Sequence, residues 1–303
     1  VAADAKSKIY GDSDPALTYQ ITSGSLVGSD SLSGSLSRVA GENVGSYAIA
    51  QNSLTAGTNY TLTFVSADLT IAKRPLTVAA DAKSKIYGDS DPALTYQITS
   101  GSLVGSDSLS GSLSRVAGEN VGSYAIGQNT LTAGGNYDLS FVSANLTITK
   151  RELLAQADDQ SRGYGQANPA LTISYTGFVT GEDTNVLDVL PSASTLADTN
   201  SPIGMYDITA SGGSDNNYSL VLSNGTLTVT LAALTVAADA KSKIYGDSDP
   251  ALTYQITSGS LVGSDSLSGS LSRVAGENVG SYAIGQNTLT AGGNYDLSFV
   301  SAN

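Results

Sequence analysis

Short stretches in which apolar and polar residues alternate recur along this chain. In residues 94–99, Leu, Tyr and Ile occupy one set of alternate positions, and Thr, Gln and Thr occupy the other. Successive side chains of a strand point to opposite faces, so this alternation predicts a half-buried strand. The same rule predicts further strands at residues 76–79, 108–115, 122–126, 137–142 and 146–149.

No segment has sustained helical periodicity. A single helical turn is expected at residues 103–108, and it lengthens in the counterpart at residues 182–187. Strands rich in Thr and Ser suit antiparallel sheet that packs one face on a core and leaves the other in water. We therefore expect an all-β chain built from small antiparallel domains of about 75 residues.

A turn precedes the strand at residues 94–99. Gly88 can adopt a positive φ, and Pro92 fixes its own φ while disfavouring helical backbone at the residue before it. Asp89 and Asp91 can each bond backbone groups two residues ahead, as in Asx-turns. The segment therefore predicts a tight, pre-set turn.

This turn and strand recur at regular spacing. The string around Tyr87 is repeated around Tyr10 and Tyr245, and a recast version surrounds Tyr164. The spacings of 77, 77 and 81 residues suit small autonomous domains rather than solenoid coils. We place four repeats at residues 1–74, 75–151, 152–232 and 233–303. The fourth stops before a counterpart of residues 146–149, so we expect the chain to be a window on a longer array.

Composition narrows the chemistry. The 303 residues include no Cys and no His, which excludes disulfides, thiolate nucleophiles and Cys-based zinc sites and removes the commonest general base and metal ligand. A net charge of -13 without a basic patch disfavours nucleic acid as a partner. No run of about 18 apolar residues exists to span a membrane. The chain starts in mid-pattern, so we expect any export signal to lie outside it.

The order of motifs resembles a known family. Tyr-Gly-Asp-x-x-Pro-x-Leu-Thr is followed by Gly-x-Tyr-x-Ile, Asn-Tyr-x-Leu-x-Phe and Leu-Thr-Ile-Thr-Lys, and residues 152–232 carry the same order in altered form. This order is similar to the MBG-type (YGX-type) repeat of large bacterial surface and secreted adhesins. The resemblance implies mostly-β modules, β-grasp-like or small β-sandwiches, strung in tandem as the stalk of an extracellular adhesin. It implies no catalytic, cofactor-binding or metal-binding residues.

The paired carboxylates of the turn are the first candidate site. They are Asp12/Asp14, Asp89/Asp91 and Asp247/Asp249. Two carboxylates with nearby carbonyls could hold Ca²⁺. In repeat 3 the same positions are Gln166 and Asn168, which lose the charge while Asn keeps its turn chemistry. We interpret the pairs as turn formers.

The second candidate is a recurring charge pair four residues apart. It occurs as Arg38/Glu42, Arg115/Glu119 and Arg273/Glu277, with Ser201 at the Glu position of repeat 3. We interpret it as a surface ion pair across a turn, worth roughly 0–1 kcal/mol. A covalent link from Lys83 or Lys85 to Asn or Asp, assisted by Glu119, is disfavoured because repeat 3 lacks both the Lys83 counterpart and the Glu.

The third candidate is the set of 16 tyrosines. Surface aromatics bind sugars and proteins well. However, Tyr96, Tyr124 and Tyr137 share the parity of Leu and Ile neighbours, which places them in the core. Tyr87 follows a strand at a turn, so it is a lip residue or part of a domain junction.

These observations favour a structural stalk or spacer of a cell-surface or secreted bacterial adhesin over an enzyme. Every acidic pair is either repeated in near-copies or lost in repeat 3, whereas catalytic sites are single constellations. The expected partners are neighbouring repeats, with any host or biofilm ligand bound by domains outside this window. The alternative is a module that binds glycan or host protein through repeat 3. That repeat alone carries Phe178, Pro191, Pro202, Met205 and the loop at residues 215–217.

Overall fold

The computed structural model describes residues 1–303, which form two compact units. The N-terminal unit, Val1–Thr149, holds repeats 1 and 2, and the C-terminal unit, Lys150–Asn303, holds repeats 3 and 4. No helix in either unit is long and apolar enough to cross a membrane.

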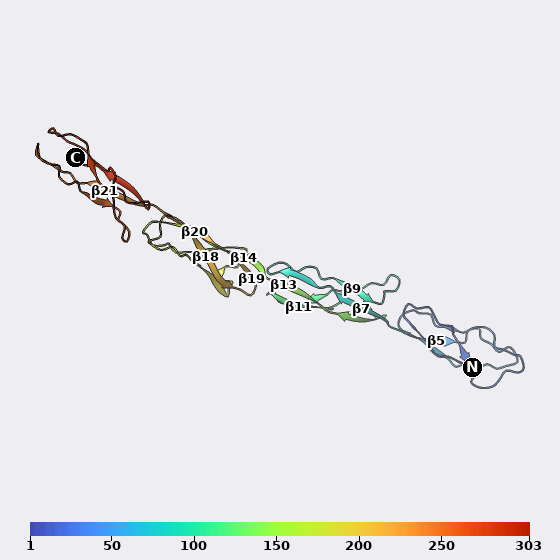
Figure 1. Ribbon diagram of the computed structural model, residues 1–303. Coiled ribbons are helices and arrows are strands. Elements are labelled where there is room, and N and C mark those ends of the chain that lie inside the picture. The colour runs from blue at the N-terminus through green and yellow to red at the C-terminus, as the bar shows by residue number, and fades with distance from the viewer. The chain divides into compact units, whose positions relative to one another are not determined.

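The first strands of repeats 2, 3 and 4 begin at Arg74, Arg151 and Ala232, one residue before the boundaries placed from the sequence, and these residues are counted with the repeat that they open. Repeat 2 shows the architecture most completely. Its strands are β7 (Arg74–Ala80), β8 (Lys83–Ile86), β9 (Tyr96–Ser100), β10 (Ser114–Arg115), β11 (Gly122–Gly127), β12 (Tyr137–Val142) and β13 (Ala144–Thr149). They form a three-stranded sheet in the order β12-β7-β9 and a four-stranded sheet in the order β10-β11-β13-β8. Within the repeat, β7 and β9 lie toward one end and β11 and β13 toward the other (Figure 1).

Two long extended segments supply both sheets. β7 continues into β8 across Asp81 and Ala82, and β12 continues into β13 across Ser143. The two segments run parallel to each other, with Tyr137 opposite Arg74 in the first sheet and Leu146 opposite Lys83 in the second. β9 and β11 then pair antiparallel on β7 and β13, which places the sheets in succession along the repeat.

Burial follows the alternation of the sequence. In β13, Leu146 and Ile148 are buried while Thr147 between them is exposed. In β7, Leu76 and Val78 are buried and form a core cluster with Leu131 and Tyr137. One-sided burial of this kind fixes the strand register, because a slip by one residue would expose the whole apolar set.

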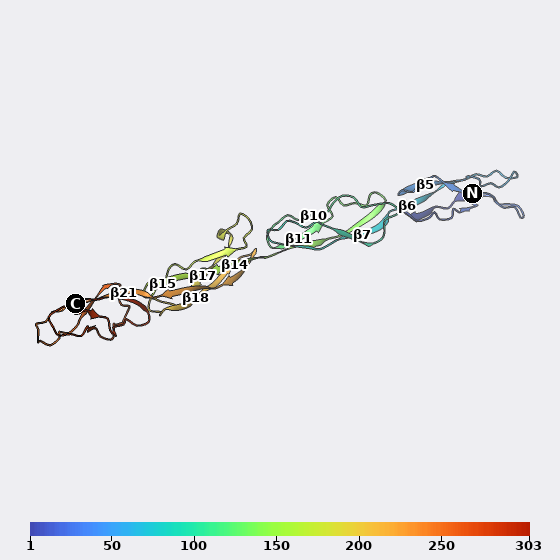
Figure 2. The same ribbon diagram turned by 90° about the horizontal axis from the view of Figure 1, so that it is seen from above.

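The other repeats follow the same scheme. Repeat 1 contains β1 (Ala2–Ala3), β2 (Lys6–Ile9), β3 (Tyr19–Gln20), β4 (Ser37–Arg38), β5 (Gly45–Ala50) and β6 (Ala67–Ala72). Repeat 3 contains β14 (Arg151–Ala157), β15 (Gln160–Gly163), β16 (Ile173–Thr176), η1 (Thr184–Val186), β17 (Val189–Ser194), β18 (Gly204–Ser214), β19 (Tyr218–Ser223) and β20 (Gly225–Thr230). Repeat 4 contains β21 (Ala232–Ala238), β22 (Tyr254–Ser258), β23 (Ser272–Arg273), β24 (Ile284–Gly285) and β25 (Tyr295–Val300). Several of these strands are labelled in the view turned by 90° (Figure 2).

The expected all-β tandem fold is confirmed, and one detail differs. The pairing is mixed rather than purely antiparallel, because β7 pairs with β12 and β8 with β13 in parallel. Alternation reports which face is buried but not the direction of the partner strand. Each repeat has two sheets and no α-helix.

Candidate functional site

The repeated turn has the predicted geometry. In repeat 1 the Asp12 amide donates to the Ile9 carbonyl over 3.0 Å, and Gly11 has a φ of +84°. A type II turn needs a positive φ at this third position, which glycine supplies without strain. Equivalent bonds close the other three turns. The prediction of a tight turn is therefore correct, and glycine rather than aspartate forms it.

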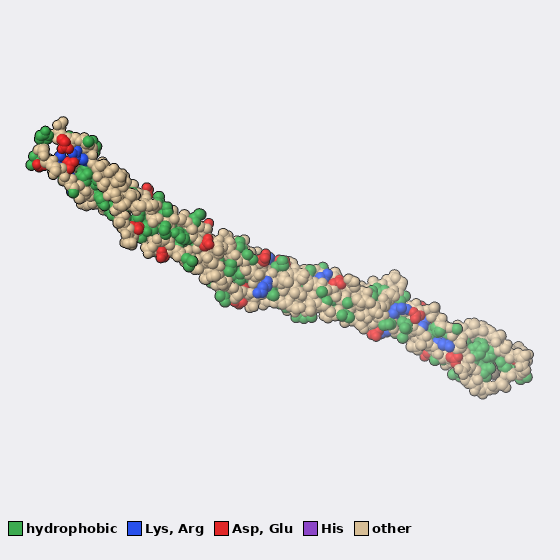
Figure 3. Space-filling model, in the orientation of Figure 1, with side chains coloured by type: hydrophobic (Ala, Val, Ile, Leu, Met, Phe, Trp, Pro, Cys, Tyr) green, Lys and Arg blue, Asp and Glu red, His purple; other side chains and the backbone are tan.

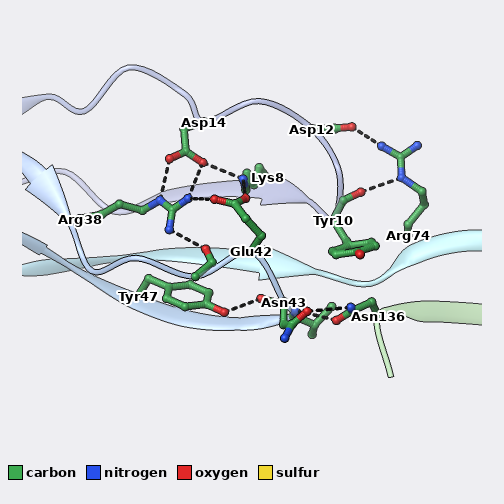
Figure 4. Close-up of polar contacts among 12 residues, drawn as sticks. Lys8, Tyr10, Asp12, Asp14, Arg38, Glu42, Asn43, Tyr47, Arg74 and Asn136 are labelled. Carbon is green, nitrogen blue, oxygen red and sulfur yellow. Dashed lines mark hydrogen bonds and ion pairs between the residues drawn. The ribbon is translucent and has the colours of Figure 1, made fainter. Parts of the chain in front are cut away.

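The second carboxylate of the turn enters a four-charge cluster instead. In repeat 1 this charge cluster consists of Lys8, Asp14, Arg38 and Glu42 (Figure 4). Arg38 Nε lies 2.6 Å from Asp14, Lys8 Nζ lies 2.7 Å from Asp14 and 2.5 Å from Glu42, and Arg38 also contacts Glu42. Arg38 Nη1 donates to the Gly41 carbonyl over 2.6 Å. The cluster is electrically balanced, and most donors of the guanidinium are used.

The cluster holds its groups in their charged forms. Hydrogen bonds from Arg38 and then from Lys8 lower the pKa of Asp14 to about 2. Hydrogen bonds to Asp14 and then to Glu42 raise the pKa of Lys8. A carboxyl that condenses with an amine must be protonated and the amine neutral, so both directions oppose a covalent lysine link in this repeat.

Repeats 2 and 4 contain the same charge cluster. Its members are Lys85, Asp91, Arg115 and Glu119 in repeat 2, and Lys243, Asp249, Arg273 and Glu277 in repeat 4, with ion-pair distances of 2.5–2.7 Å. A cavity of about 270 Å³ opens beside the cluster of repeat 4. The four members of the charge cluster that line this cavity pair with one another.

Repeat 3 replaces the cluster by one cation and neutral acceptors. Arg162 stands where repeat 2 has Lys85, and it is 5% exposed. Its Nε donates to Asn168 Oδ1 over 2.7 Å, and its Nη2 donates to the Asp198 carbonyl. Asn168 in turn donates to the Ala197 carbonyl over 2.7 Å. The buried cation is therefore hydrogen-bonded without any carboxylate.

These contacts show what the side chains of the first two candidate sites bind. The predicted Arg38–Glu42 pair forms, and Asp14 and Lys8, which were not predicted to take part, join it. Asp14 serves the cluster rather than the predicted Asx-turn, because its two oxygens face Arg38 and Lys8. No group of three or more Asp, Glu, His or Cys side chains is arranged to hold a metal ion.

A tyrosine joins repeat 1 to repeat 2. The Tyr10 hydroxyl donates to Asp107 Oδ2 over 3.0 Å, and the Tyr137 hydroxyl donates to the same oxygen over 2.6 Å. The two rings pack edge to face with centroids 5.5 Å apart. Tyr137 also accepts from the Val104 amide over 2.7 Å. Gly11 lies so close to Val104 that a Cβ there would stand 2.4 Å from a methyl group.

Further polar contacts surround this ring pair. Arg74 Nε donates to the Tyr10 carbonyl over 2.6 Å, and Arg74 Nη2 contacts Asp12 (Figure 4). Asn136 Nδ2 donates to Asn43 Oδ1 over 3.0 Å, and Asn136 Oδ1 accepts from the backbone amide of residue 44 over 3.0 Å. Repeat 2 therefore contacts both the turn of repeat 1 and the loop before β5.

Repeats 3 and 4 are joined by the same ring pair. The Tyr164 hydroxyl donates to Asp265 over 2.9 Å, the Tyr295 hydroxyl donates to it over 2.6 Å, and the ring centroids are 5.5 Å apart. Tyr164 and Val229 belong to a core cluster with Leu234 and other residues of repeat 4. Burial and then the bond to Asp265 raise the pKa of Tyr295 to about 12.

The tyrosine predictions are confirmed in part. Tyr137 is buried, and Tyr96 and Tyr124 are half-buried. The sequence suggested a lip or junction role for Tyr87, and its counterparts Tyr10 and Tyr164 occupy junctions. The partner Asp107 was missed, although the recurrence of Val-Gly-Ser-Asp in repeats 1, 2 and 4 was a signal.

The residues particular to repeat 3 are mostly structural. Phe178 packs between Tyr175 and Tyr218, with centroids 5.8 and 5.4 Å away. Pro191 is buried in β17, and Asp215 accepts from the backbone amides of residues 217 and 218 over 2.7 Å. Met205 remains exposed. On the face seen in Figure 3, charged side chains are sparse among uncharged polar surface.

One of the comparisons with known proteins identifies the repeat. The family model described as the MBG domain (YGX type) matches residues 1–70, 76–147, 153–228 and 234–303. No curated protein matches the chain. Similar solved structures include protocadherin gamma B7 extracellular cadherin domains 1–4, with 11% identity, a TM-score of 0.24, and coverage of 83% of this chain and 76% of that chain. They also include protocadherin gamma B2 domains 1–5, with 9% identity, a TM-score of 0.21 and coverage of 84% and 59%. Drosophila N-cadherin EC1-4 has 9% identity, a TM-score of 0.16 and coverage of 74% and 70%. These TM-scores are too low to carry an argument, whereas the family match spans nearly the whole chain, and the protein therefore belongs to the MBG domain (YGX type) family, as a tandem array of four such domains.

Proposed function

We propose that this array is a stalk segment of an extracellular bacterial adhesin, and that it projects a binding domain from the cell surface. The observation that carries the proposal is the junction. Tyr10 of repeat 1 bonds Asp107 of repeat 2, and Tyr164 of repeat 3 bonds Asp265 of repeat 4 in the same way. A contact that is reused between successive domains has the property a spacer needs, because reach then grows with the number of repeats.

Short connections support the same role. Only Lys73 separates β6 from β7, and only Leu231 separates β20 from β21. A one-residue connection leaves few backbone torsions in which neighbouring repeats can bend. Together with the ring pair, it favours load-bearing over free flexing.

The surface chemistry suits an exposed, soluble location. The chain is acidic, free of Cys and rich in Ser and Thr. Net charge of one sign keeps chains apart, and the absence of thiols makes the fold indifferent to an oxidising environment. In this proposal the array's own partners are neighbouring repeats, and the ligand belongs to another domain.

Small-angle scattering tests the proposal. A compact globule of 303 residues would have a radius of gyration of about 19 Å by the size scaling of folded domains. We expect a clearly larger value. Insertion of a second copy of residues 75–151 should lengthen the maximum dimension by roughly 30 Å, the diameter of one such domain. A radius near 19 Å, or an insertion that leaves the maximum dimension unchanged, would contradict the stalk.

A second candidate is ligand binding by repeat 3. It is favoured by two large apolar side chains on its surface, since Leu196 is fully exposed and Met205 is 77% exposed. Exposed apolar groups mark binding surfaces only when they form a patch. The test is binding of the whole chain to a glycan array and to host extracellular proteins, with L196S/M205S as the control variant. Binding that this variant loses would favour the second candidate, and silence of both chains would count against it.

A further inference from the structure

The two junctions share a ring pair and an amide–asparagine bond, and they differ in the other side-chain contacts around them. At both junctions a tyrosine hydroxyl donates to an aspartate across the boundary, over 3.0 Å for Tyr10 and 2.9 Å for Tyr164. At both, a backbone amide donates to an asparagine Oδ1, at 3.0 Å for Asn136 and 3.2 Å for Asn294. These constant contacts define the surface by which any repeat of this kind accepts its neighbour.

Repeats 1 and 2 add three contacts to this constant set. Arg74 spans the boundary with one bond to the Tyr10 carbonyl and one to the Asp12 carboxylate. Asn136 also reaches the Asn43 side chain. We call Arg74 and Asp12 the clasp. Because the two bonds of Arg74 point in fixed directions, they restrict tilt and twist as well as separation.

All three contacts are lost together between repeats 3 and 4. The positions equivalent to Arg74, Asp12 and Asn43 are Ala232, Gln166 and Pro202. Alanine has no donor, glutamine has no charge, and proline has no side-chain acceptor. Both members of the clasp have changed, which is the pattern of a matched pair rather than of a single random loss.

Apolar packing and the two constant hydrogen bonds remain between repeats 3 and 4. Tyr164 is 7% exposed and packs with Leu234, Val236 and Tyr295 of repeat 4. Beside it lies an open depression of about 540 Å³, lined in part by Ile203 and Asp296. Hydrophobic contact is non-directional, so it resists separation but not rotation.

We infer that the clasp is the part of the junction surface that matches one repeat to the next and fixes their orientation, and that repeats 3 and 4, which lack it, form the looser junction. The inference rests on the proposed function in one respect only: in a stalk, the looser junction places a bend at a defined point. The partner is the following repeat, recognised by an arginine at the first position of its first strand.

The ion pair of the clasp should make the first junction sensitive to salt concentration. The Arg74 side chain is 23% exposed and the Asp12 side chain is 51% exposed. An ion pair open to water is screened by salt, with a Debye length of about 10 Å at 0.1 M and about 3 Å at 1 M. The range of orientations between repeats 1 and 2 should therefore widen in high salt, while the range between repeats 3 and 4 should not.

Spin-label distance distributions on the full chain test this inference. The chain has no cysteine, so introduced cysteines are labelled uniquely. A48C/A125C spans the junction of repeats 1 and 2, and D207C/A283C spans that of repeats 3 and 4 at equivalent exposed positions. We expect the first distribution to be narrower, and R74A should widen it to the width of the second.

A transplant provides the converse test. Q166D/A232R should narrow the distribution across repeats 3 and 4 and make it sensitive to 1 M NaCl. If Q166D/A232R folds poorly, R74A by itself still tests the inference. Equal widths in the parent chain, or an R74A distribution that does not change, would overturn the inference. Scattering could still report an extended array in that case, so failure of the clasp and failure of the stalk are distinguishable.

Discussion

At the scale of single residues, Gly118 shows how tightly the loops are built. It has a φ of +149°, and a Cβ there would stand 2.1 Å from the Tyr124 ring. Its carbonyl also accepts from Arg115 Nη1 over 2.6 Å, and the Arg115 guanidinium lies 5.5 Å from the centre of the same ring. Glycine is required here because backbone, ring and cation meet at one point.

We therefore expect G118A to destabilise the N-terminal unit by about 3 kcal/mol, since backbone strain and displacement of a ring act together. The matched control is G135A, where a Cβ meets nothing within 4 Å and where repeat 1 carries Thr58. Urea unfolding measures both. Equal losses in the two variants would contradict the steric account.

The charge clusters predict a response to acid. Bonds from Arg115 and then Lys85 lower the pKa of Asp91 to about 2, below its value in an unfolded chain. The stabilisation is complete above about pH 4 and is lost as the pH falls toward 2, because the unfolded chain takes up the proton first. The Asp91 side chain is 39% exposed, so we discount the effect to about 1 kcal/mol.

Amide resonances of Ile126 in repeat 2 and Ile208 in repeat 3 can follow urea unfolding at pH 5 and pH 2.5. Repeat 2 should lose stability between these values, and D91N should reduce that loss, with a remainder from Glu119, whose pKa is lowered by bonds from Lys85 and then Arg115. Repeat 3, in which Arg162 bonds Asn168 and carbonyls, gives the response of a repeat without the cluster, where bonds from Ser174 and then Thr172 lower the pKa of Asp158. An acid response of equal size in D91N would mean that other carboxyls cause it.

At the scale of elements, alternation in the sequence located most strands of repeat 2 but not their directions. Residues 137–142 were predicted as a strand and form β12 with the same bounds. The stretch 108–115 was predicted as one strand, yet only Ser114–Arg115 forms a strand, with a separate bridge at Ser110. β8 was missed because its four residues are too short for alternation to stand out from the turn that follows.

One of the two segments predicted to be helical forms a 3₁₀-helix, and the other does not. Residues 182–187 contain the 3₁₀-helix η1, whose first turn is capped by Asp183, and residues 103–108 form only a turn closed by the Asp107 amide and the Val104 carbonyl. Only the Arg–Glu pair of the charge cluster could be predicted from the sequence, because its two residues lie four positions apart. Asp14 is 24 residues from Arg38, and a single sequence offers no rule that pairs them.

Strand β13 provides a test at this scale. Leu146 is fully buried between β8 and β11, so L146A should cost about 2–5 kcal/mol through lost burial and the cavity left behind. T147A changes the exposed neighbour on the opposite face and should cost little. Thermal unfolding compares them. A large effect from T147A would show that the assigned register is wrong.

At the scale of the whole molecule, the junctions decide whether repeats unfold singly or in pairs. Tyr10 packs on Tyr137 and bonds Asp107, and Arg74 returns from repeat 2 to the turn that carries Tyr10. In a linear array, stability is a sum of repeat terms and nearest-neighbour terms. Small repeats depend on the second kind, because a domain of this size buries a limited core.

We expect repeats 1 and 2 of the parent chain to unfold in one transition and Y10A to separate them into two. Loss of the ring pair should also speed amide exchange in β12 roughly tenfold, which corresponds to one aromatic contact. Differential scanning calorimetry and hydrogen exchange measure the two effects. Exchange in repeats 3 and 4, where Tyr164 is intact, serves as the control. If Y10A leaves a single transition and unchanged exchange in β12, the repeats are coupled by their backbone connection alone, and the tyrosine only fills space.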